Sequence, residues 1–322
     1  MRRRVIPILS SVVLGLATAL VPAASAHAAS PGDSTGQPPT WTLPADYVAL
    51  GDSYAAGYGL PQQDALPGMA AQLCARSSQA YPELVAAQER TASSFDFVAC
   101  SGAITTDIVK SQALYGGATA APQEDALSPR THVVTLTIGG NDVGFGDAAY
   151  CLQAPETPGC ADLGARIQAA LYALSLPDTN SPGISILDPL SGTTVVVTPL
   201  ATILADIHRR SPQAQVFVSN YPVLLAECAQ GLPTGGPQIP QIEADNAANM
   251  ALNGVIAGAV AAAGPMVHLV DAASAFTGHS VCSASPWIAL STLHPNVVGQ
   301  AAFANTFEQE VSSVLGPRPA RS

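Results

Sequence analysis

The stretch Tyr47-Val-Ala-Leu-Gly-Asp-Ser-Tyr-Ala-Ala-Gly57 carries a short apolar run directly into a turn that contains a serine. Residues 47–50 fit a strand buried on both faces of a sheet, and Gly51 permits a tight turn after it. A serine where a parallel strand ends lies at the open edge of the sheet, where α/β proteins bind ligands. Ser53 is therefore a candidate nucleophile, although Gly-Asp-Ser alone is also a common turn and helix cap.

Three later stretches supply the other groups that acyl transfer requires: Cys100-Ser-Gly-Ala103, Gly139-Gly-Asn-Asp142 and His294-Pro-Asn296. Ester cleavage by a serine needs a base within reach and hydrogen-bond donors for the oxyanion of the tetrahedral intermediate. Gly102 offers an unobstructed backbone N–H, and Asn141 offers a side-chain amide. His294, held in a turn before the last helix, is the candidate base. The backbone N–H of Ser53 itself is the third candidate oxyanion donor.

The rest of the chain alternates between strand and helix patterns, which predicts βαβ units and a mostly parallel sheet. Further strands are expected at 95–99, 131–138, 215–219 and 266–270, and helices at 81–90, 195–210, 242–263 and 296–315. Residues 150–189 contain several prolines and glycines, with a short helix after Asp162, and we interpret them as an insertion near the site. No internal repeat or second linker is visible, so we expect one domain over residues 46–322.

The first 29 residues have the organisation of a secretory signal peptide. Three arginines at positions 2–4 precede an apolar stretch from about 5 to 20, and small residues follow at 24–29. A polar leader rich in proline and glycine spans 30–45, and we expect it to be mobile. The protein is therefore predicted to be secreted and extracellular. The alanine-rich segment 249–264 is expected to be a soluble helix because Asn253 and neighbouring glycines interrupt it.

Without the three leader arginines, nine basic side chains face 23 acidic ones, which gives a net charge of about −14. Such a surface disfavours nucleic acid and anionic membranes as partners. We expect a monomer with no stable membrane insertion. Six cysteines in an exported chain favour disulfides, and fifteen pairings are possible. Their spacing lacks the repeated Cys-x-x-Cys of a zinc site, so no metal site is predicted.

Taken together, Ser53, Gly102, Asn141 and His294 and the motifs around them resemble the signature of the SGNH hydrolase superfamily, also called GDSL esterases and lipases. The resemblance covers essentially the whole chain after residue 45. Within the superfamily the chain is most similar to secreted actinobacterial esterases and lipases, which have three disulfides and a segment like that from Asp271 to His279. The resemblance implies a flavodoxin-like, three-layer α/β/α fold with a mostly parallel five-stranded sheet, no cofactor, and hydrolysis of carboxylic esters.

The resemblance also implies sequential disulfides, which would join Cys74 to Cys100, Cys151 to Cys160, and Cys228 to Cys282. One position departs from the common pattern of the superfamily, which has an aspartate three residues before the histidine, where this chain has Ser291. Related secreted esterases use a main-chain carbonyl there, so the carbonyl of Ser291 is expected to orient His294. Asp271 is the rival, but its sequence context suggests a structural hydrogen bond.

Three functions remain open from the sequence. The leading hypothesis is a secreted serine esterase or lipase that acts on an acyl ester or lipid. The same residues would serve an acetyl esterase on a polysaccharide. A non-catalytic binding domain of the same fold is the third hypothesis, and only the missing aspartate favours it.

Overall fold

The computed structural model describes residues 46–61, 69–88, 94–229, 231–232 and 239–316, all within one compact unit. Its centre is a five-stranded sheet in the order β2-β1-β5-β8-β9, and every neighbouring pair is parallel. The strands are β1 (Asp46–Gly51), β2 (Ser94–Phe97), β5 (Thr131–Thr137), β8 (Gln215–Ser219) and β9 (Val267–Val270). The parallel five-stranded sheet expected from the sequence is confirmed.

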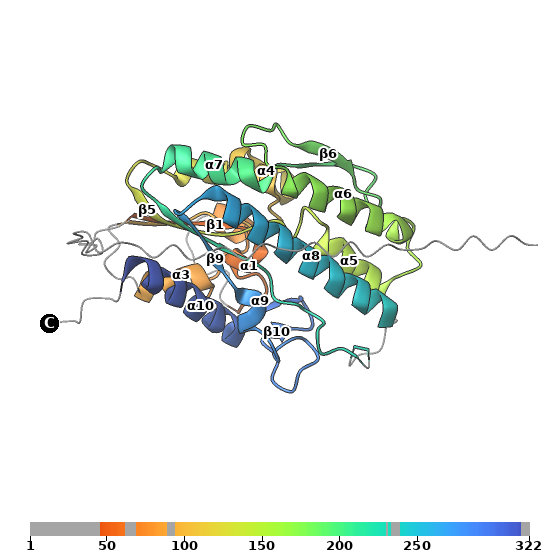
Figure 1. Cartoon of the computed structure of the whole chain (residues 1–322). Coiled ribbons are helices and arrows are strands. Elements are labelled where there is room, and N and C mark those ends of the chain that lie inside the picture. The colour runs from red at the N-terminus through yellow and green to blue at the C-terminus, as the bar shows by residue number, and fades with distance from the viewer. Residues whose placement is uncertain (1–45, 62–68, 89–93, 230, 233–238, 317–322) are drawn as a thin grey trace, which may run out of the picture. The chain divides into compact units, whose positions relative to one another are not determined.

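Helices cover both faces of this sheet (Figure 1). α3 and α10 pack together on one face, and α4, α6, α7 and α8 lie on the other. The helices are α1 (Ser53–Ala56), α2 (Met69–Leu73), α3 (Tyr81–Gln88), α4 (Thr105–Val109), α5 (Phe145–Gln153), α6 (Leu163–Ser175), α7 (Leu200–Arg210), α8 (Ile239–Ala263), α9 (Ala272–Ala275) and α10 (Val297–Leu315). The fold therefore has the three α/β/α layers expected from the sequence.

Strand β1 shows why helices are needed on both sides. Val48 and Leu50 belong to the core under α4, α6, α7 and α8, whereas Tyr47 and Ala49 belong to the core under α3 and α10. Alternate side chains of a strand point to opposite faces, so a strand that is apolar at every position must be covered twice.

Short elements complete the described chain. Three small antiparallel pairs are β3 (Gln112–Ala113) with β4 (Thr119–Ala120), β6 (Ile184–Leu187) with β7 (Thr194–Val197), and β10 (Ile288–Ala289) with β11 (His294–Pro295). Single 3₁₀ turns occur at Tyr115–Gly117, Gln123–Ala126 and Cys160–Asp162.

The prediction of one helix over 195–210 is wrong in its first part. Residues Thr194–Val197 form β7, which pairs with β6, and the helix α7 begins only at Leu200. Two local features explain the difference. A run of β-branched residues favours a strand, and Pro199 has no backbone N–H and suits the start of a helix. The segment 150–189 contributes α6, the helix expected after Asp162, and β6 to the domain.

Among the described residues, α8 alone is long and apolar enough to cross a membrane by length and composition. Three of its asparagines nevertheless bind the backbone of the loop after β8. Asn246 donates to the carbonyl of Leu225, and Asn249 and Asn253 donate to the carbonyls of Pro222 and Tyr221. These hydrogen bonds attach one face of α8 to the domain.

Three disulfides join the cysteines in sequential order, as the resemblance implied: Cys74 to Cys100, Cys151 to Cys160, and Cys228 to Cys282. The first lies beside the Gly102 turn, where the N–H of Ser101 also donates to the carbonyl of Cys74. The bridge therefore fixes the backbone that precedes Gly102.

The order of the strands explains where the predicted site residues meet. The chain passes from β1 to β2 on one side, and the later strands are added on the other side of β1, beginning with β5. The carboxyl ends of β1 and β5 therefore flank a topological switch point, where open α/β sheets form their ligand crevice. Ser53 follows β1 and Asn141 follows β5, so both emerge at this crevice.

Candidate active site

Ser53 is the first residue of α1, and the turn that presents it is built by Gly51 and Asp52. Gly51 has a φ of +141°, and a Cβ at this position would lie 2.5 Å from the carbonyl oxygen of Thr137 on β5. Only glycine fits such a close approach. Asp52 caps the helix, because its Oδ1 accepts a hydrogen bond of 2.9 Å from the N–H of Tyr54.

The second carboxylate oxygen of Asp52 accepts a 2.5 Å hydrogen bond from the hydroxyl of Tyr221, which follows β8. Both side chains are buried, and burial raises the pKa of Asp52 to about 7. Asp52 therefore fixes the turn from two sides.

His294 lies in β11 and faces Ser53. Its Nε2 is 2.6 Å from the Oγ of Ser53, and its Nδ1 is 2.6 Å from the carbonyl oxygen of Thr292. A carbonyl can only accept, so Nδ1 carries the hydrogen and the Nε2 of the neutral ring is free to accept from the serine hydroxyl. The pair has the contact geometry of a nucleophile with its general base.

The prediction that the carbonyl of Ser291 orients His294 is wrong, because the carbonyl of Thr292 occupies that place. The cause is the backbone of Leu293, whose φ is +56°. This left-handed conformation is uncommon for leucine, and it folds the chain so that the carbonyl two residues before the histidine reaches Nδ1. The rarer conformation is supported by a 2.8 Å hydrogen bond from the hydroxyl of Tyr54 to the carbonyl of Leu293.

Asp271 does not contact His294. Its oxygens accept hydrogen bonds from the side-chain amide of Asn220 and from the N–H and hydroxyl of Ser274. The carboxylate thus caps α9 and binds the end of β8, which is the structural role that its sequence context suggested.

Burial lowers the pKa of His294 to about 4, although its bond to the Thr292 carbonyl acts in the opposite direction. The rings of Tyr54 and Tyr58 lie against the imidazole, with centroids 4.8 and 5.1 Å away. A low-dielectric surrounding disfavours the imidazolium. His294 is therefore neutral, and able to accept a proton, over the whole range near neutral pH.

The two remaining predicted residues lie on neighbouring loops. Gly102 is exposed and has a φ of +80°, and Asn141 donates from Nδ2 to the carbonyl of Ala103 at 2.9 Å. Asn141 lines a cavity of about 80 Å³ together with Ser53 and His294, and Gly102 adjoins the residue that Asn141 binds. The structure thus brings three of the four predicted residues to one cavity and ties the loop of the fourth to it.

Asp142 strengthens this link between the two loops. It is buried and accepts from the N–H of Thr105 at 3.0 Å and from the hydroxyl of Thr105 at 2.6 Å. Burial raises the pKa of Asp142 to about 7. The carboxylate therefore holds the two loops in position and lies outside the lining of the cavity.

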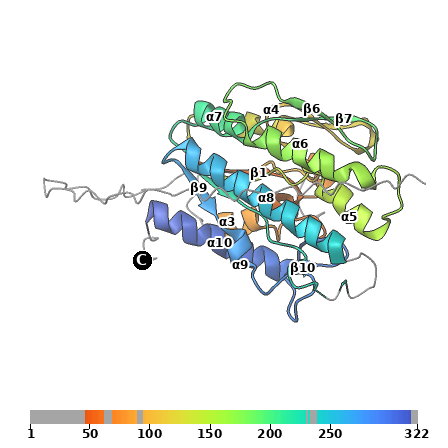
Figure 2. The same cartoon turned by 45° about the vertical axis from the view of Figure 1, so that its right-hand side comes forward.

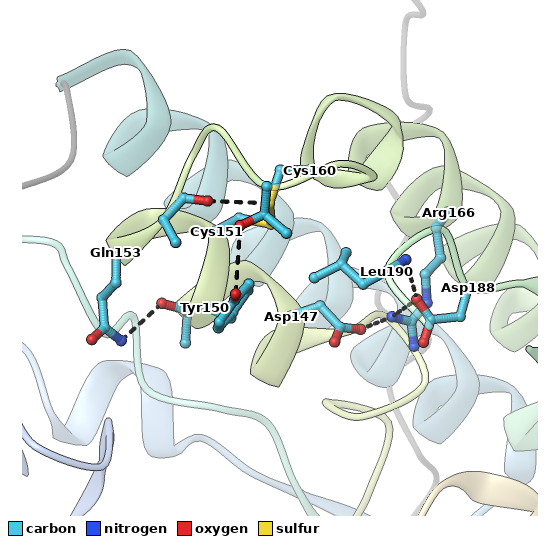
Figure 3. The surroundings of a disulfide bond; sticks show 11 residues. Asp147, Tyr150, Cys151, Gln153, Cys160, Arg166, Asp188 and Leu190 are labelled. Carbon is cyan, nitrogen blue, oxygen red and sulfur yellow. Dashed lines mark hydrogen bonds and ion pairs between the residues drawn. A yellow bond between two sulfur atoms is a disulfide. The ribbon is translucent and has the colours of Figure 1, made fainter. Parts of the chain in front are cut away.

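Arg166 of α6 is a buried cation that sequence reasoning missed. Figure 3 shows it between Asp147 of α5 and Asp188 of the turn after β6, and both carboxylates contact its Nη1. Its Nη2 donates a 3.4 Å hydrogen bond to the carbonyl of Asn141. Arg166 thus attaches the Asn141 loop to α6, while Asp142 attaches it to the loop of Gly102.

Comparison with known proteins agrees with this geometry. Residues 49–302 match the GDSL-like lipase/acylhydrolase family. Lipase 1 of Streptomyces coelicolor is 33% identical over 309 residues, which cover 94% of this chain and 96% of that protein. A lipase of Streptomyces rimosus is 32% identical over 265 residues, covering 80% and 82% of the two chains.

Solved structures give the same result. The crystal structure of phospholipase A1 from Streptomyces albidoflavus NA297 aligns with a TM-score of 0.63 at 30% identity, and covers 83% of this chain and all of that one. The extracellular lipase of Streptomyces rimosus aligns with a TM-score of 0.61 at 30% identity, covering 83% and 99%. The fold, the site and these likenesses agree, and the chain belongs to the GDSL-like lipase/acylhydrolase family of ester hydrolases.

Proposed function

We propose that this ester hydrolase is a secreted serine esterase or lipase that works through an acyl-enzyme on Ser53. The observation that carries the proposal is the contact between Ser53 Oγ and His294 Nε2 at 2.6 Å, with Nδ1 held by a main-chain carbonyl. This arrangement supplies a nucleophile, a base and a fixed tautomer, which are the three requirements for activating a serine.

In the first half of the reaction, Ser53 Oγ bonds to the acyl carbon and its proton passes to His294 Nε2. The negative charge that develops on the carbonyl oxygen is stabilised by the N–H groups of Ser53 and Gly102 and by Nδ2 of Asn141. His294 then gives the proton to the departing alkoxide. In the second half, a water molecule attacks the acyl carbon and gives a proton to His294 Nε2. His294 then returns this proton to Ser53 Oγ as the bond to the acyl carbon breaks, and the carboxylic acid leaves.

The carbonyl of Thr292 takes the place that a carboxylate has in a Ser-His-Asp triad. It fixes the tautomer of His294 and its orientation, but it brings no negative charge to the imidazolium. Burial lowers the pKa of His294 and so also disfavours the imidazolium, as the lack of a neighbouring carboxylate does. The base is therefore weak, and it returns its proton readily to the leaving group.

Export is part of the proposal. Three disulfides suit an oxidising compartment, and residues 1–29 have the pattern of a signal peptide. A Streptomyces rimosus relative is described as an extracellular lipase.

Labelling with a p-nitrophenyl phosphonate tests the mechanism. We expect one phosphonyl group on the intact protein, located on Ser53 by peptide mapping, and we expect Ser53→Ala to lower kcat by about 10⁶ as in the comparable subtilisin variant. A folded protein that neither takes up the phosphonate nor hydrolyses short p-nitrophenyl esters would be a binding domain instead.

A further inference from the structure

The cavity at Ser53 does not end at the catalytic residues. Away from the serine it is lined by four apolar side chains: Phe145, Ala149, Leu224 and Leu293. The same four side chains also line a second, narrower cavity of about 30 Å³. Because these four side chains line both cavities, the two cavities adjoin, and the wall that they share is apolar. We call the series of adjoining cavities that begins at Ser53 the passage.

The narrow cavity in turn adjoins a third and much larger one. Four apolar side chains line both of them: Ala148, Leu152, Ile167 and Ala248. The third cavity has a volume of about 540 Å³ and lies between α5, α6 and α8, which are neighbours in both views of the molecule (Figures 1 and 2). We call this third cavity the α5–α6–α8 groove.

Small side chains on α8 create the groove. Four alanines at helical spacing form its wall: Ala244, Ala247, Ala248 and Ala251. A methyl group is the smallest apolar side chain with a Cβ, so this face leaves open the space that larger residues would fill. In keeping with this, only 22% of the most apolar 18-residue window of α8 is buried.

We propose that the acyl chain of the substrate leaves Ser53 past Phe145 and Leu224 and lies in the α5–α6–α8 groove, so that the preferred substrates are esters of long, unbranched fatty acids. The inference rests on the function proposed above, because it assigns the space that adjoins the acyl-enzyme. Each methylene group that the passage removes from water favours binding by about fourfold. The passage therefore determines the preference for acyl-chain length, whereas the residues around Ser53 carry out the reaction.

Asp245 is an acidic side chain that lines both the narrow cavity and the groove. Its Oδ2 is buried without a hydrogen-bond partner in the described part of the chain, and Gln241, one turn earlier on α8, has a buried Oε1 in the same condition. Burial raises the pKa of Asp245 to about 6. An unpaired carboxylate opposes the entry of hydrocarbon, so Asp245 limits the gain from long chains.

The test compares kcat/KM for p-nitrophenyl laurate with that for p-nitrophenyl butyrate at pH 7. Ala248→Phe, at the junction of the two cavities, is expected to lower the laurate-to-butyrate ratio by about tenfold or more. Ala244→Phe, at an exposed position in the groove, is expected to lower the ratio as well. It serves as the test if Ala248→Phe folds poorly. Asp245→Leu should raise the ratio, and Asp245→Asn should change it less.

Ala262→Phe is the matched control, because it makes the same substitution at an exposed position of α8 outside the groove. It should leave both rates unchanged. Loss of butyrate hydrolysis in Ser53→Ala concerns the proposed function, whereas the ratio concerns only the groove.

A second substrate series keeps the acyl group short and lengthens the alcohol. If the Ala248→Phe and Ala244→Phe variants change selectivity along that series and leave the laurate-to-butyrate ratio as it was, the groove holds the alcohol and the assignment to the acyl chain is wrong. Variants that keep the parent ratio in both series would show that the groove binds neither part of the substrate.

Discussion

The hydroxyl of Tyr54 donates a 2.8 Å hydrogen bond to the main-chain carbonyl of Leu293 and so joins the residue after Ser53 to the residue before His294. These two parts of the chain are 239 residues apart in sequence. The bond also supports the left-handed backbone of Leu293, which places the Thr292 carbonyl on Nδ1 of His294. One side chain therefore aligns Ser53 with His294, the proposed nucleophile and base.

Removing only this hydroxyl tests the alignment. Tyr54→Phe keeps the ring that lies against His294 and leaves the buried carbonyl of Leu293 without its donor. We expect kcat to fall by about tenfold with little change in KM, and the free energy of unfolding to fall by about 1–2 kcal/mol. Steady-state kinetics and thermal unfolding measure the two effects. Tyr115→Phe, at a side chain that is 92% exposed, is the control. An unchanged kcat in Tyr54→Phe would show that this hydrogen bond does not contribute to catalysis.

The carboxylate of Asp271 provides a second prediction. Since its oxygens bind Asn220 and Ser274, Asp271→Asn should retain more than about a tenth of kcat, whereas loss of the triad aspartate costs about 10⁴ in trypsin. Ser291→Ala should change the rate by only about twofold, because neither its side chain nor its carbonyl holds His294. A loss of about a thousandfold in folded Asp271→Asn would require a triad after all.

The dependence of kcat/KM on pH is the third prediction. His294 must be neutral to accept the serine proton, and its lowered pKa of about 4 keeps it neutral as the pH falls. The acid limb assigned to His294 should therefore have its midpoint near pH 4 and not near the ordinary histidine value of about 6.5. The pH profile of kcat/KM is obtained from the hydrolysis of a short ester, with the product measured by chromatography. Circular dichroism at each pH checks that the protein stays folded.

Two buried carboxyls could add a limb of their own, because burial raises the pKa of Asp52 and of Asp142 to about 7. Asp52→Asn separates these contributions: it should remove any limb near pH 7 that belongs to Asp52 and leave the lower limb in place. A single limb with its midpoint near 6.5 that persists in Asp52→Asn would contradict the effect assigned to burial of His294.

The sequence predicts those parts of the molecule that depend on local patterns. Runs such as Thr131–Thr137 are apolar and β-branched, and their glycine breaks put Ser53, Gly102 and Asn141 after the ends of strands. Parallel strands bring their carboxyl ends to one edge, so position along the chain already implies proximity. For this reason the sheet and the cluster of candidate residues follow from the sequence alone.

The parts that the sequence does not predict depend on tertiary contacts. Leu293 carries no signal for a positive φ, which glycine or asparagine would have given. Nothing in the sequence therefore corrected the resemblance, which places the acceptor one residue too early. Arg166 reaches the Asn141 loop from α6, and no local pattern identifies a buried guanidinium. Strand β7 is different, because its β-branched run and the following Pro199 are local signals for a strand that ends before a helix begins.

Arg166 has one consequence for how substrate binding and reactivity are related. Its guanidinium contacts Asp147 of α5 and the carbonyl of Asn141, while Ile167, the next residue of α6, lines the α5–α6–α8 groove. If the proposed acyl chain separates α5 from α6, it also moves the loop of Asn141, whose amide is proposed to receive the oxyanion. Affinity for the acyl chain and stabilisation of the transition state are then thermodynamically linked. The length of the acyl chain should therefore change kcat as well as KM.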